Sequence, residues 1–137
     1  MISILILKKQ HKNIFEILDE ISYYTETENK LKENTSEVII NIDLLNKKFF
    51  SHLEMEDIFL YPEFIKVTKN TNIATLNIED SFKLSTQILN FKNTYNNTEN
   101  LLKKPKKFKE DFNNILNQIK TKFLNEETNI YSLIKEN

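Results

Sequence analysis

Residues 45–59 of the chain read LNKKFFSHLEMEDIF. Positions 45, 49, 52, 56 and 59 recur at intervals of three and four, the spacing that places side chains on one face of an α-helix. Three of these positions are apolar, whereas His52 and Glu56 interrupt the stripe with ionisable side chains. The segment therefore predicts a helix whose buried face carries a polar pair.

The same spacing predicts four helices along the chain. We expect them over residues 3–32, over residues 35–67, from near Asn77 until the Asn-rich stretch 93–100, and over residues 105–135. The remaining apolar stripes consist of Ile4, Leu7, Ile14, Leu18 and Ile21, then Val38 and Ile42, then Leu84, Ile88, Phe91 and Tyr95, and last Phe108, Phe112, Ile115, Ile119, Ile130 and Leu133.

Local signals support these boundaries. Asn34, with Glu37 three residues later, is a predicted N-cap for the second helix. Pro62 is expected to kink or break that helix, and Pro105 suits a first helical turn.

Composition favours an all-α fold. The 137 residues include no glycine and only two prolines, whereas sheet proteins usually use glycine in turns and bulges. Short connections make successive helices antiparallel, so we expect an up-down-up-down four-helix bundle in a single domain, residues 1–137.

The charge balance points to no nucleic acid or membrane partner. Nineteen basic and twenty acidic residues nearly cancel, and the basic run 103–107 is interpreted as a solvated helix start. The apolar segment 1–7 is too short to span a membrane and is expected to form the buried first turns of the first helix. The absence of cysteine fits a reducing compartment, so we expect a soluble cytoplasmic protein.

Six polar side chains fall on the predicted inward faces, and the predicted turns bring them to similar heights. They are His11, His52, Glu56, Asp80, Lys122 and Glu126. Folding the chain at its turns places His11 near Glu56, Glu56 within a turn of Asp80, and Asp80 opposite Lys122. The sequence therefore predicts one polar layer in the core.

Each residue also has an ordinary structural explanation. An inward histidine is more often a hydrogen-bonded core residue than a ligand, Glu126 could extend to solvent, and Asp80 could be a first-turn carboxylate. Together, however, buried charges must be paired, neutralised or bound to a cation. Three carboxylates and one ammonium leave a charge of minus two, which one divalent cation would balance.

At these residues the chain resembles the hemerythrin-like (HHE, cation-binding) domains. The matching segments are Leu7-Lys8-Lys9-Gln10-His11, His52-Leu53-Glu54-Met55-Glu56 with the following Asp57-Ile58-Phe59-Leu60-Tyr61-Pro62, and Glu126-Glu127-Thr128-Asn129-Ile130-Tyr131. The resemblance implies a four-helix bundle that holds a non-haem, usually di-iron, centre. It also implies that histidines of the first two helices bind one iron and that two carboxylates bridge the pair.

The chain departs from this pattern at two positions. Asp80 stands where the family has the histidine of its third helix, and Lys122 stands where it has the histidine of its fourth. We therefore expect one iron, manganese or zinc ion on His11, His52, Glu56 and Glu126, with the Lys122 ammonium at the second-metal position. Asp80 is expected to pair with Lys122 or to serve as a further ligand.

The resemblance implies oxygen or nitric-oxide sensing, or iron handling, and an enzyme is the less favoured interpretation. One alternative is a metal-free interaction or structural module in which Lys122 replaces the metal charge. Another is a carboxylate-rich di-metal oxidase or peroxidase. Tyr61 and Tyr131 each follow a site glutamate by five residues; we expect packed or interfacial tyrosines, and supporting or redox-active roles are the alternative.

Overall fold

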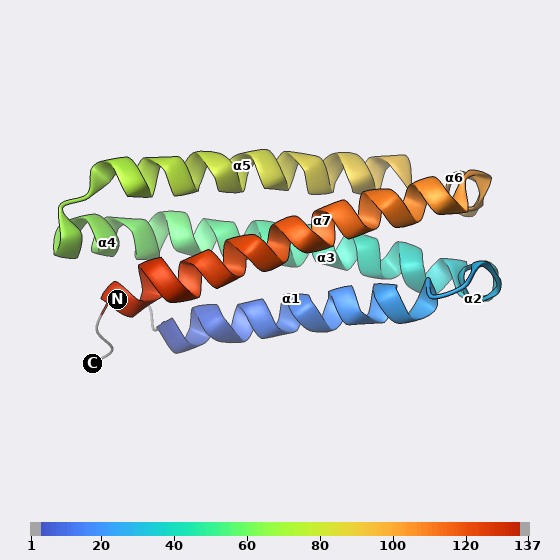
Figure 1. Cartoon of the computed structure of the whole chain (residues 1–137), viewed down its shortest axis with the longest axis horizontal. Helices are drawn as coiled ribbons and strands as arrows, with labels where there is room; N and C mark the ends of the chain where they lie inside the picture. The colour runs from blue at the N-terminus through green and yellow to red at the C-terminus, as the bar shows by residue number, and fades with distance from the viewer. Residues whose placement is uncertain (1–3, 135–137) are drawn as a thin grey trace.

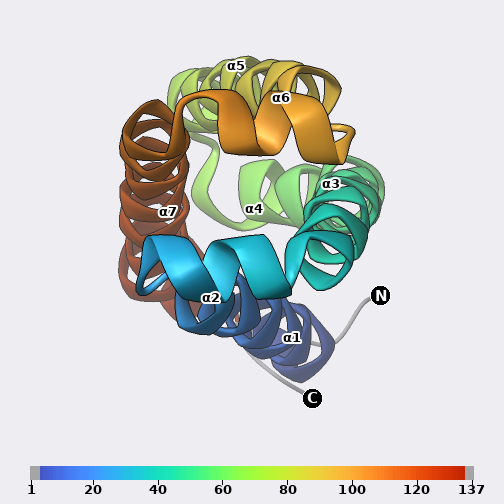
Figure 2. The same ribbon diagram turned by 90° about the vertical axis from the view of Figure 1, so that its right-hand side faces the viewer.

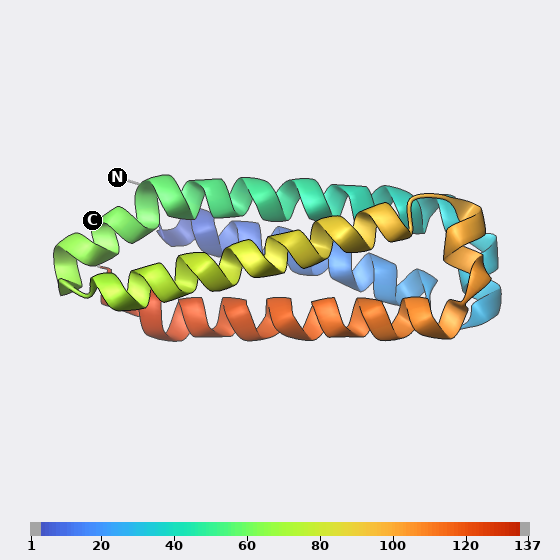
Figure 3. The ribbon, with the colours of Figure 1, turned by 90° about the horizontal axis from the view of Figure 1, so that it is seen from above.

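The computed structural model describes residues 4–134 and is predominantly helical, without strands in that range, which confirms the predicted all-α class. Within these residues, four long helices lie side by side (Figures 1 and 3). They are α1 (Ile4–Tyr24), α3 (Thr35–Met55), α5 (Thr71–Thr94) and α7 (Pro105–Asn125).

Shorter elements connect and extend the long helices. The short helices α2 (Glu28–Glu33) and α6 (Thr98–Lys103) lie across one end of the molecule, as Figure 2 shows. At the opposite end, α3 continues through the π-helix η1 (Glu56–Leu60) into α4 (Tyr61–Thr68). Helix α7 continues through the π-helix η2 (Glu126–Ile130) into the 3₁₀-helix η3 (Tyr131–Leu133). In Figure 1, α1 and α5 run toward the end with α2 and α6, and α3 and α7 run back.

The apolar stripes form two separate clusters with a polar layer between them. Along α1, Leu7 belongs to the cluster at the α4 end and Ile14 to the larger cluster, and His11 lies between them. The larger cluster includes Leu18, Ile42 and Phe112, all buried. Burial of these side chains is the main force that holds the helices together. The break between the clusters is where the candidate site lies.

The first helix ends earlier than predicted. A continuous helix to residue 32 is wrong, because α1 ends at Tyr24 and the chain turns before α2. The Oγ1 of Thr27 accepts a hydrogen bond from the backbone N–H of Lys30 at 3.1 Å and so caps α2. A polar segment, 25–27, therefore interrupts the helix although no glycine or proline marks it.

One predicted helix cap and one predicted helix start also need correction. Helix α3 begins at Thr35, but the Asn34 side chain makes no cap; its Nδ2 donates to the Lys30 carbonyl instead, at 2.8 Å. Helix α5 begins at Thr71 rather than near Asn77, because Asn70 Oδ1 accepts from the Ile73 N–H at 3.1 Å.

The π-helices shift the apolar stripe by one residue. Phe59 and Leu133 were predicted to face inward, but they are 43% and 50% exposed, and Leu60 and Ile134 are buried in their place. A π-turn contains one residue more than an α-turn, so the inward position moves along the chain by one. The interruption in the second predicted helix lies just before Pro62, and η2 forms without any proline.

The ends of the chain only partly test the predictions there. Ile4 and Leu7 are buried as expected, whereas Ile6 is 47% exposed. Residues 1–3 and 135–137, including the predicted limits of the first and fourth helices, lie outside the described residues. Over residues 4–134, no helix combines the length and apolarity that a membrane crossing requires. The cytoplasmic location and the single-domain boundary stay predictions.

Candidate metal centre

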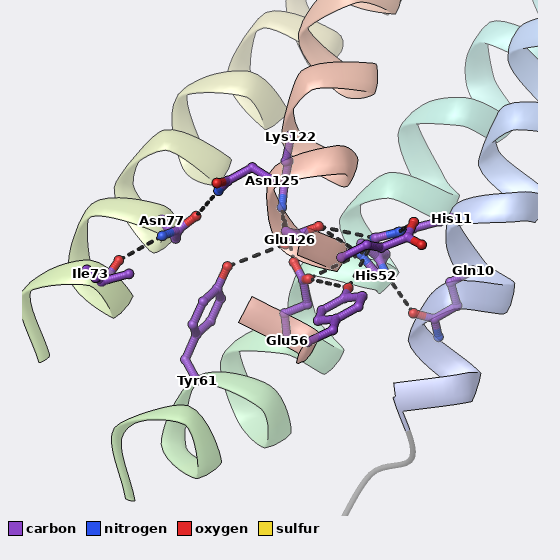
Figure 4. A network of polar contacts seen from close by, with 12 residues as sticks. Gln10, His11, His52, Glu56, Tyr61, Ile73, Asn77, Lys122, Asn125 and Glu126 are labelled. Carbon is purple, nitrogen blue, oxygen red and sulfur yellow. Dashed lines mark hydrogen bonds and ion pairs between the residues drawn. The ribbon is translucent and has the colours of Figure 1, made fainter. Parts of the chain in front are cut away.

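Four predicted ligands converge in the polar layer, as Figure 4 shows. His11 comes from the middle of α1, His52 from the last turn of α3, Glu56 from the start of η1 and Glu126 from the start of η2. All four are buried, and one potential ligand atom from each lies within 4.8 Å of the others. Residues from α1, from α3 with η1, and from η2 thus bring four potential ligand atoms close enough together to surround one metal ion.

The two imidazoles face each other with the same ring nitrogen. His11 Nε2 and His52 Nε2 lie 3.0 Å apart. Glu126 Oε1 lies 3.1 Å from His11 Nε2, and Glu56 Oε2 lies 3.4 Å from His52 Nε2. Two nitrogens and two carboxylate oxygens therefore point into one small volume.

Partners on the outer side of each ring fix which nitrogen faces inward. The Nδ1–H of His11 donates to Glu127 Oε2 at 2.8 Å, and the Nδ1–H of His52 donates to Gln10 Oε1 at 2.6 Å. Both acceptors leave Nε2 of the neutral ring with a free lone pair. Such outer partners are typical of metal-binding histidines, whose orientation and basicity they control.

Lys122 lies on the side of the two glutamates that faces away from the imidazoles. Its Nζ donates to Glu126 Oε2 at 2.6 Å and to Glu56 Oε1 at 3.2 Å. Each carboxylate therefore directs one oxygen to the ammonium and its other oxygen to the imidazoles. The lysine side chain is largely buried, with 12% of its surface exposed.

Two tyrosines complete the hydrogen bonding of the carboxylates. The Tyr131 hydroxyl donates to Glu56 Oε2 at 2.9 Å and lies 3.1 Å from His11 Nε2. The Tyr61 hydroxyl donates to Glu126 Oε2 at 3.4 Å. Both tyrosines are buried, so they pack in the core and also contact the glutamates. Within the described residues, no buried side-chain polar atom lacks a partner.

The electrostatics of the layer depend on Lys122. Burial favours the neutral form of Glu126, but the Lys122 charge and hydrogen bonds from neighbours outweigh it and hold the pKa of Glu126 well below its usual range. Burial and the charge of Glu126 raise the pKa of Glu56. Burial opposes the charged form of Lys122, but the two glutamates outweigh it and raise the lysine pKa.

Burial and the neighbouring carboxylates also set the pKa values of His52, Tyr61 and Tyr131. Burial disfavours the charged form of His52, but hydrogen bonds to Glu126 and Glu56 outweigh it and raise the imidazole pKa. Burial and the nearby carboxylates raise the phenol pKa of both Tyr61 and Tyr131. The tyrosines therefore stay protonated and act as hydrogen-bond donors.

Asp80 does not join this group, and its expected inward position is wrong. Its side chain is exposed, whereas its neighbour Ser81 is buried at 5% exposure. The stripe on α5 runs from Leu84 back by three residues to Ser81, not by four to Asp80. Asp80 instead lines a cavity of about 500 Å³ between α5 and α7, together with Ser81 and Lys122.

The sequence did not single out three residues of the site. Gln10 and Glu127 orient the histidines, and Ser81 occupies the inward position on α5. The two halves of the chain provide a signal that could have identified Ser81. Glu56 and Tyr61 in one half correspond to Glu126 and Tyr131 in the other, and the same offset carries His11 to position 81.

The donor set fits a divalent cation. Two imidazole nitrogens and two carboxylate oxygens suit iron, manganese or zinc. With neutral histidines, the charges of Glu56, Glu126 and Glu127 sum to minus three, and Lys122 contributes plus one. A divalent cation on the imidazole side would make the whole network neutral.

Comparison with known proteins agrees with this geometry. The family model described as the hemerythrin HHE cation-binding domain matches residues 3–134, nearly the whole chain. Neither the curated proteins nor the solved structures contain a significant match. Both the match along the chain and the buried His/Glu group indicate a metal site. The chain therefore belongs to the hemerythrin HHE cation-binding domain family.

Proposed function

We propose that this chain binds a single divalent metal ion, iron in the first instance, through His11, His52, Glu56 and Glu126. One observation carries the proposal: each buried glutamate gives one oxygen to Lys122 and its other oxygen to the imidazole side. The carboxylates thus lie between the Lys122 ammonium and a group of four potential ligand atoms on the imidazole side. A second positive charge on the imidazole side is then separated from Lys122 by both carboxylates.

Neighbouring side chains orient these four ligand atoms. Glu127 and Gln10 hold the two rings with Nε2 directed inward, and Phe123 stacks on the His11 ring with centroids 3.7 Å apart. Tyr131 holds the Glu56 oxygen that faces the imidazoles. Less reorganisation is needed when ligands are already oriented in this way.

The fold around the four ligand residues is part of the same proposal. The course of the long helices in Figures 1 and 3 supports the up-down-up-down four-helix bundle. A ferrous ion held there would supply redox chemistry and a coordination position for a small diatomic ligand. Oxygen or nitric-oxide sensing, or iron handling, are the roles that such a centre suits. Manganese or zinc is accommodated by the same donor types.

Metal analysis of protein purified without chelator tests the proposal. Wild-type protein reconstituted with ferrous iron under anaerobic conditions should retain about one ion per chain after gel filtration, and His52→Ala should retain none. Ser51→Ala, at the exposed neighbouring position, is the matched control and should behave as wild type. Retention of about zero or about two ions per chain by the wild type would contradict the single-ion proposal.

A second candidate function is a metal-free bundle that serves as an interaction or structural module. The observation that favours it is the satisfied network itself: Lys122 bridges both glutamates, and no buried side-chain polar atom in residues 4–134 lacks a partner. In this candidate, a protonated His52 balances the second buried glutamate, and Glu127, whose side chain is 39% exposed, is solvated. A melting temperature unchanged by ferrous, manganous and zinc ions would support it over the metal-binding proposal.

A further inference from the structure

The outer face of α1 carries a charged stripe in which the two signs are separated. Helix α1 lies along the lower edge of the bundle in Figure 1. Its lysine, aspartate and glutamate residues are all exposed, and they are Lys8, Lys9, Lys12, Glu16, Asp19 and Glu20. Their spacing of three and four residues puts them on one side of the helix, opposite the buried Leu7 and Ile14. The first half of this stripe is therefore positive, and the second half is negative.

This order of charges is unfavourable within α1 itself. The helix has no acidic residue in its first turn and no basic residue in its last, whereas the helix dipole favours both. Lys8 and Lys12, four residues apart, form a like-charged pair. Glu16 and Glu20 form another, and such pairs destabilise a helix. Within residues 4–134, none of the six charged side chains of the stripe takes part in an ion pair.

The same order of charges is favourable against a second copy of the stripe. When two copies of α1 pack antiparallel with their Ile14 positions level, the positive half of each helix lies beside the negative half of the other. The facing groups are Lys8 and Lys9 with Asp19 and Glu20, and Lys12 with Glu16. A two-fold axis repeats every contact, so all six charges of each copy face an opposite charge. In a parallel pair each charge would face its own like.

Apolar side chains at the two ends of the stripe match in the same arrangement. Leu5 is 71% exposed and Tyr23 is 55% exposed. Eighteen residues separate them (23 against 5), which is five turns of an α-helix, so both lie on the charged side. In the antiparallel pair Leu5 of one copy lies opposite Tyr23 of the other. The Tyr23 ring also has Lys30 Nζ 4.1 Å from its centroid, within the same chain.

The negative half of the stripe borders a groove that can receive lysine side chains. This groove, of about 740 Å³, lies between α1 and α3 and is lined by Glu16, Asp19 and Glu20, with Tyr23 beside them. Lys48 of α3 is the basic residue among the lining side chains. Three carboxylates and one ammonium leave the groove with a charge of minus two. Long cationic side chains from another copy therefore fit it in both shape and charge.

We propose that the chain forms a symmetric antiparallel dimer through the outer face of α1, with a second copy of itself as the partner. This inference goes beyond the metal centre, because the α1 ligand His11 is buried on the other side of the helix. One helix from each copy makes a small interface, so the dimer is weak, with a Kd on the order of 10–100 μM. Its ion pairs lie at the surface, so salt weakens it.

Sedimentation velocity with charge reversal tests the proposal. Between about 10 μM and about 1 mM, the wild type should show a monomer–dimer equilibrium whose Kd rises at least roughly 10-fold from about 0.05 M to about 0.5 M salt. The two reversed variants are Lys8→Glu/Lys9→Glu/Lys12→Glu, with a wholly acidic stripe, and Glu16→Lys/Asp19→Lys/Glu20→Lys, with a wholly basic one. Each should be monomeric alone, and an equimolar mixture of the two should dimerise. All six reversals in one chain should restore self-association.

A matched control separates the stripe from net charge. Lys106→Glu/Lys109→Glu/Lys120→Glu changes the net charge as much as the lysine reversal on α1 does, at exposed positions of α7, and should dimerise as the wild type does. Both α1 reversals place charges where the helix dipole favours them, so the melting temperature should not fall when the dimer is lost.

Several outcomes would overturn the inference. They are a wild type that stays monomeric at about 1 mM in low salt, a Kd that salt does not change, a dimer that survives either α1 reversal, a mixture that stays monomeric, or an equal loss in the control. Metal retention by the wild type is a separate measurement, so failure of the dimer and failure of the proposed function are distinguishable.

Discussion

The Tyr131 hydroxyl donates a hydrogen bond of 2.9 Å to Glu56 Oε2, and so joins the C-terminal part of the bundle to the start of η1. Both groups are buried. Tyr61 makes the equivalent contact to Glu126 Oε2, but at 3.4 Å.

We predict that Tyr131→Phe destabilises the protein more than Tyr61→Phe. Loss of the shorter bond leaves a buried carboxylate oxygen without its tyrosine donor, which costs roughly 1–3 kcal/mol. Tyr61→Phe removes a longer, weaker bond, and Lys122 still donates to the same oxygen. Urea unfolding of chelator-treated protein measures both variants, and an equal loss of stability would contradict the prediction.

Removal of Lys122 should steepen the loss of stability with rising pH that the raised pKa values of Glu56 and His52 already give the metal-free protein. The depressed pKa of Glu126 means that its charged form stabilises the wild type above the usual carboxyl range and that this stability is lost as pH falls. In Lys122→Met two buried carboxylates face each other without the ammonium, so the already raised carboxyl pKa rises further, and more stability is lost as pH increases.

We therefore expect Lys122→Met to be destabilised by roughly 3–5 kcal/mol at neutral pH and to recover part of that loss near the acid end of the folded range. Thermal unfolding in chelator, compared between about pH 5 and about pH 8, measures the slope. Lys120→Met, at an exposed position on α7, is the control and should keep the wild-type slope. Parallel slopes for Lys122→Met and the wild type would argue against this role for Lys122.

Loss of either outer partner should weaken metal binding without abolishing it. Gln10→Ala and Glu127→Ala each remove the acceptor that holds one imidazole, so we expect a roughly 10–100-fold loss of affinity. Competition with a chromophoric chelator gives the affinities. Lys9→Ala and Thr128→Ala, at the exposed neighbouring positions, are the controls. Affinities equal to wild type in the first pair would show that the rings need no outer partner.

Metal should stabilise the folded chain through linkage. An ion that binds only the folded state adds about 2.7 kcal/mol to the free energy of unfolding when its free concentration is 100 times the Kd. His52→Ala removes an inward donor and should show no such increase. Differential scanning calorimetry with and without ferrous iron measures this effect, and an equal increase in His52→Ala would place the ion elsewhere.

Much of the fold could be predicted because its cause is local in the sequence. Intervals of three and four residues identified inward residues such as Leu18, Ile42 and Phe112 correctly. The short helices α2 and α6 were missed because polar turns such as Thr25–Thr27 depend on side-chain caps that helical periodicity does not report.

The site was predicted only in part because its details depend on spatial relations. His11, His52, Glu56 and Glu126 stand on strong stripes, so their convergence followed from the heights of the helices. Asp80 stands on α5, where the predicted start was six residues too late (77 against 71), and where a choice between spacings of three and four decides which side chain faces inward. Ser81, a small neutral residue, gave no chemical signal of its own.

The π-turns make the centre dependent on helix phase. In an uninterrupted α-helix, residues five apart point about 140° away from each other, so Glu56 and Tyr61 would not both face the core. The additional residue in η1 brings them into phase, and η2 does the same for Glu126 and Tyr131. Deletion of Ile58 alone would therefore rotate α4 by about 100° relative to α3 and turn Tyr61 and Phe64 away from the interior, although no ligand residue would be changed.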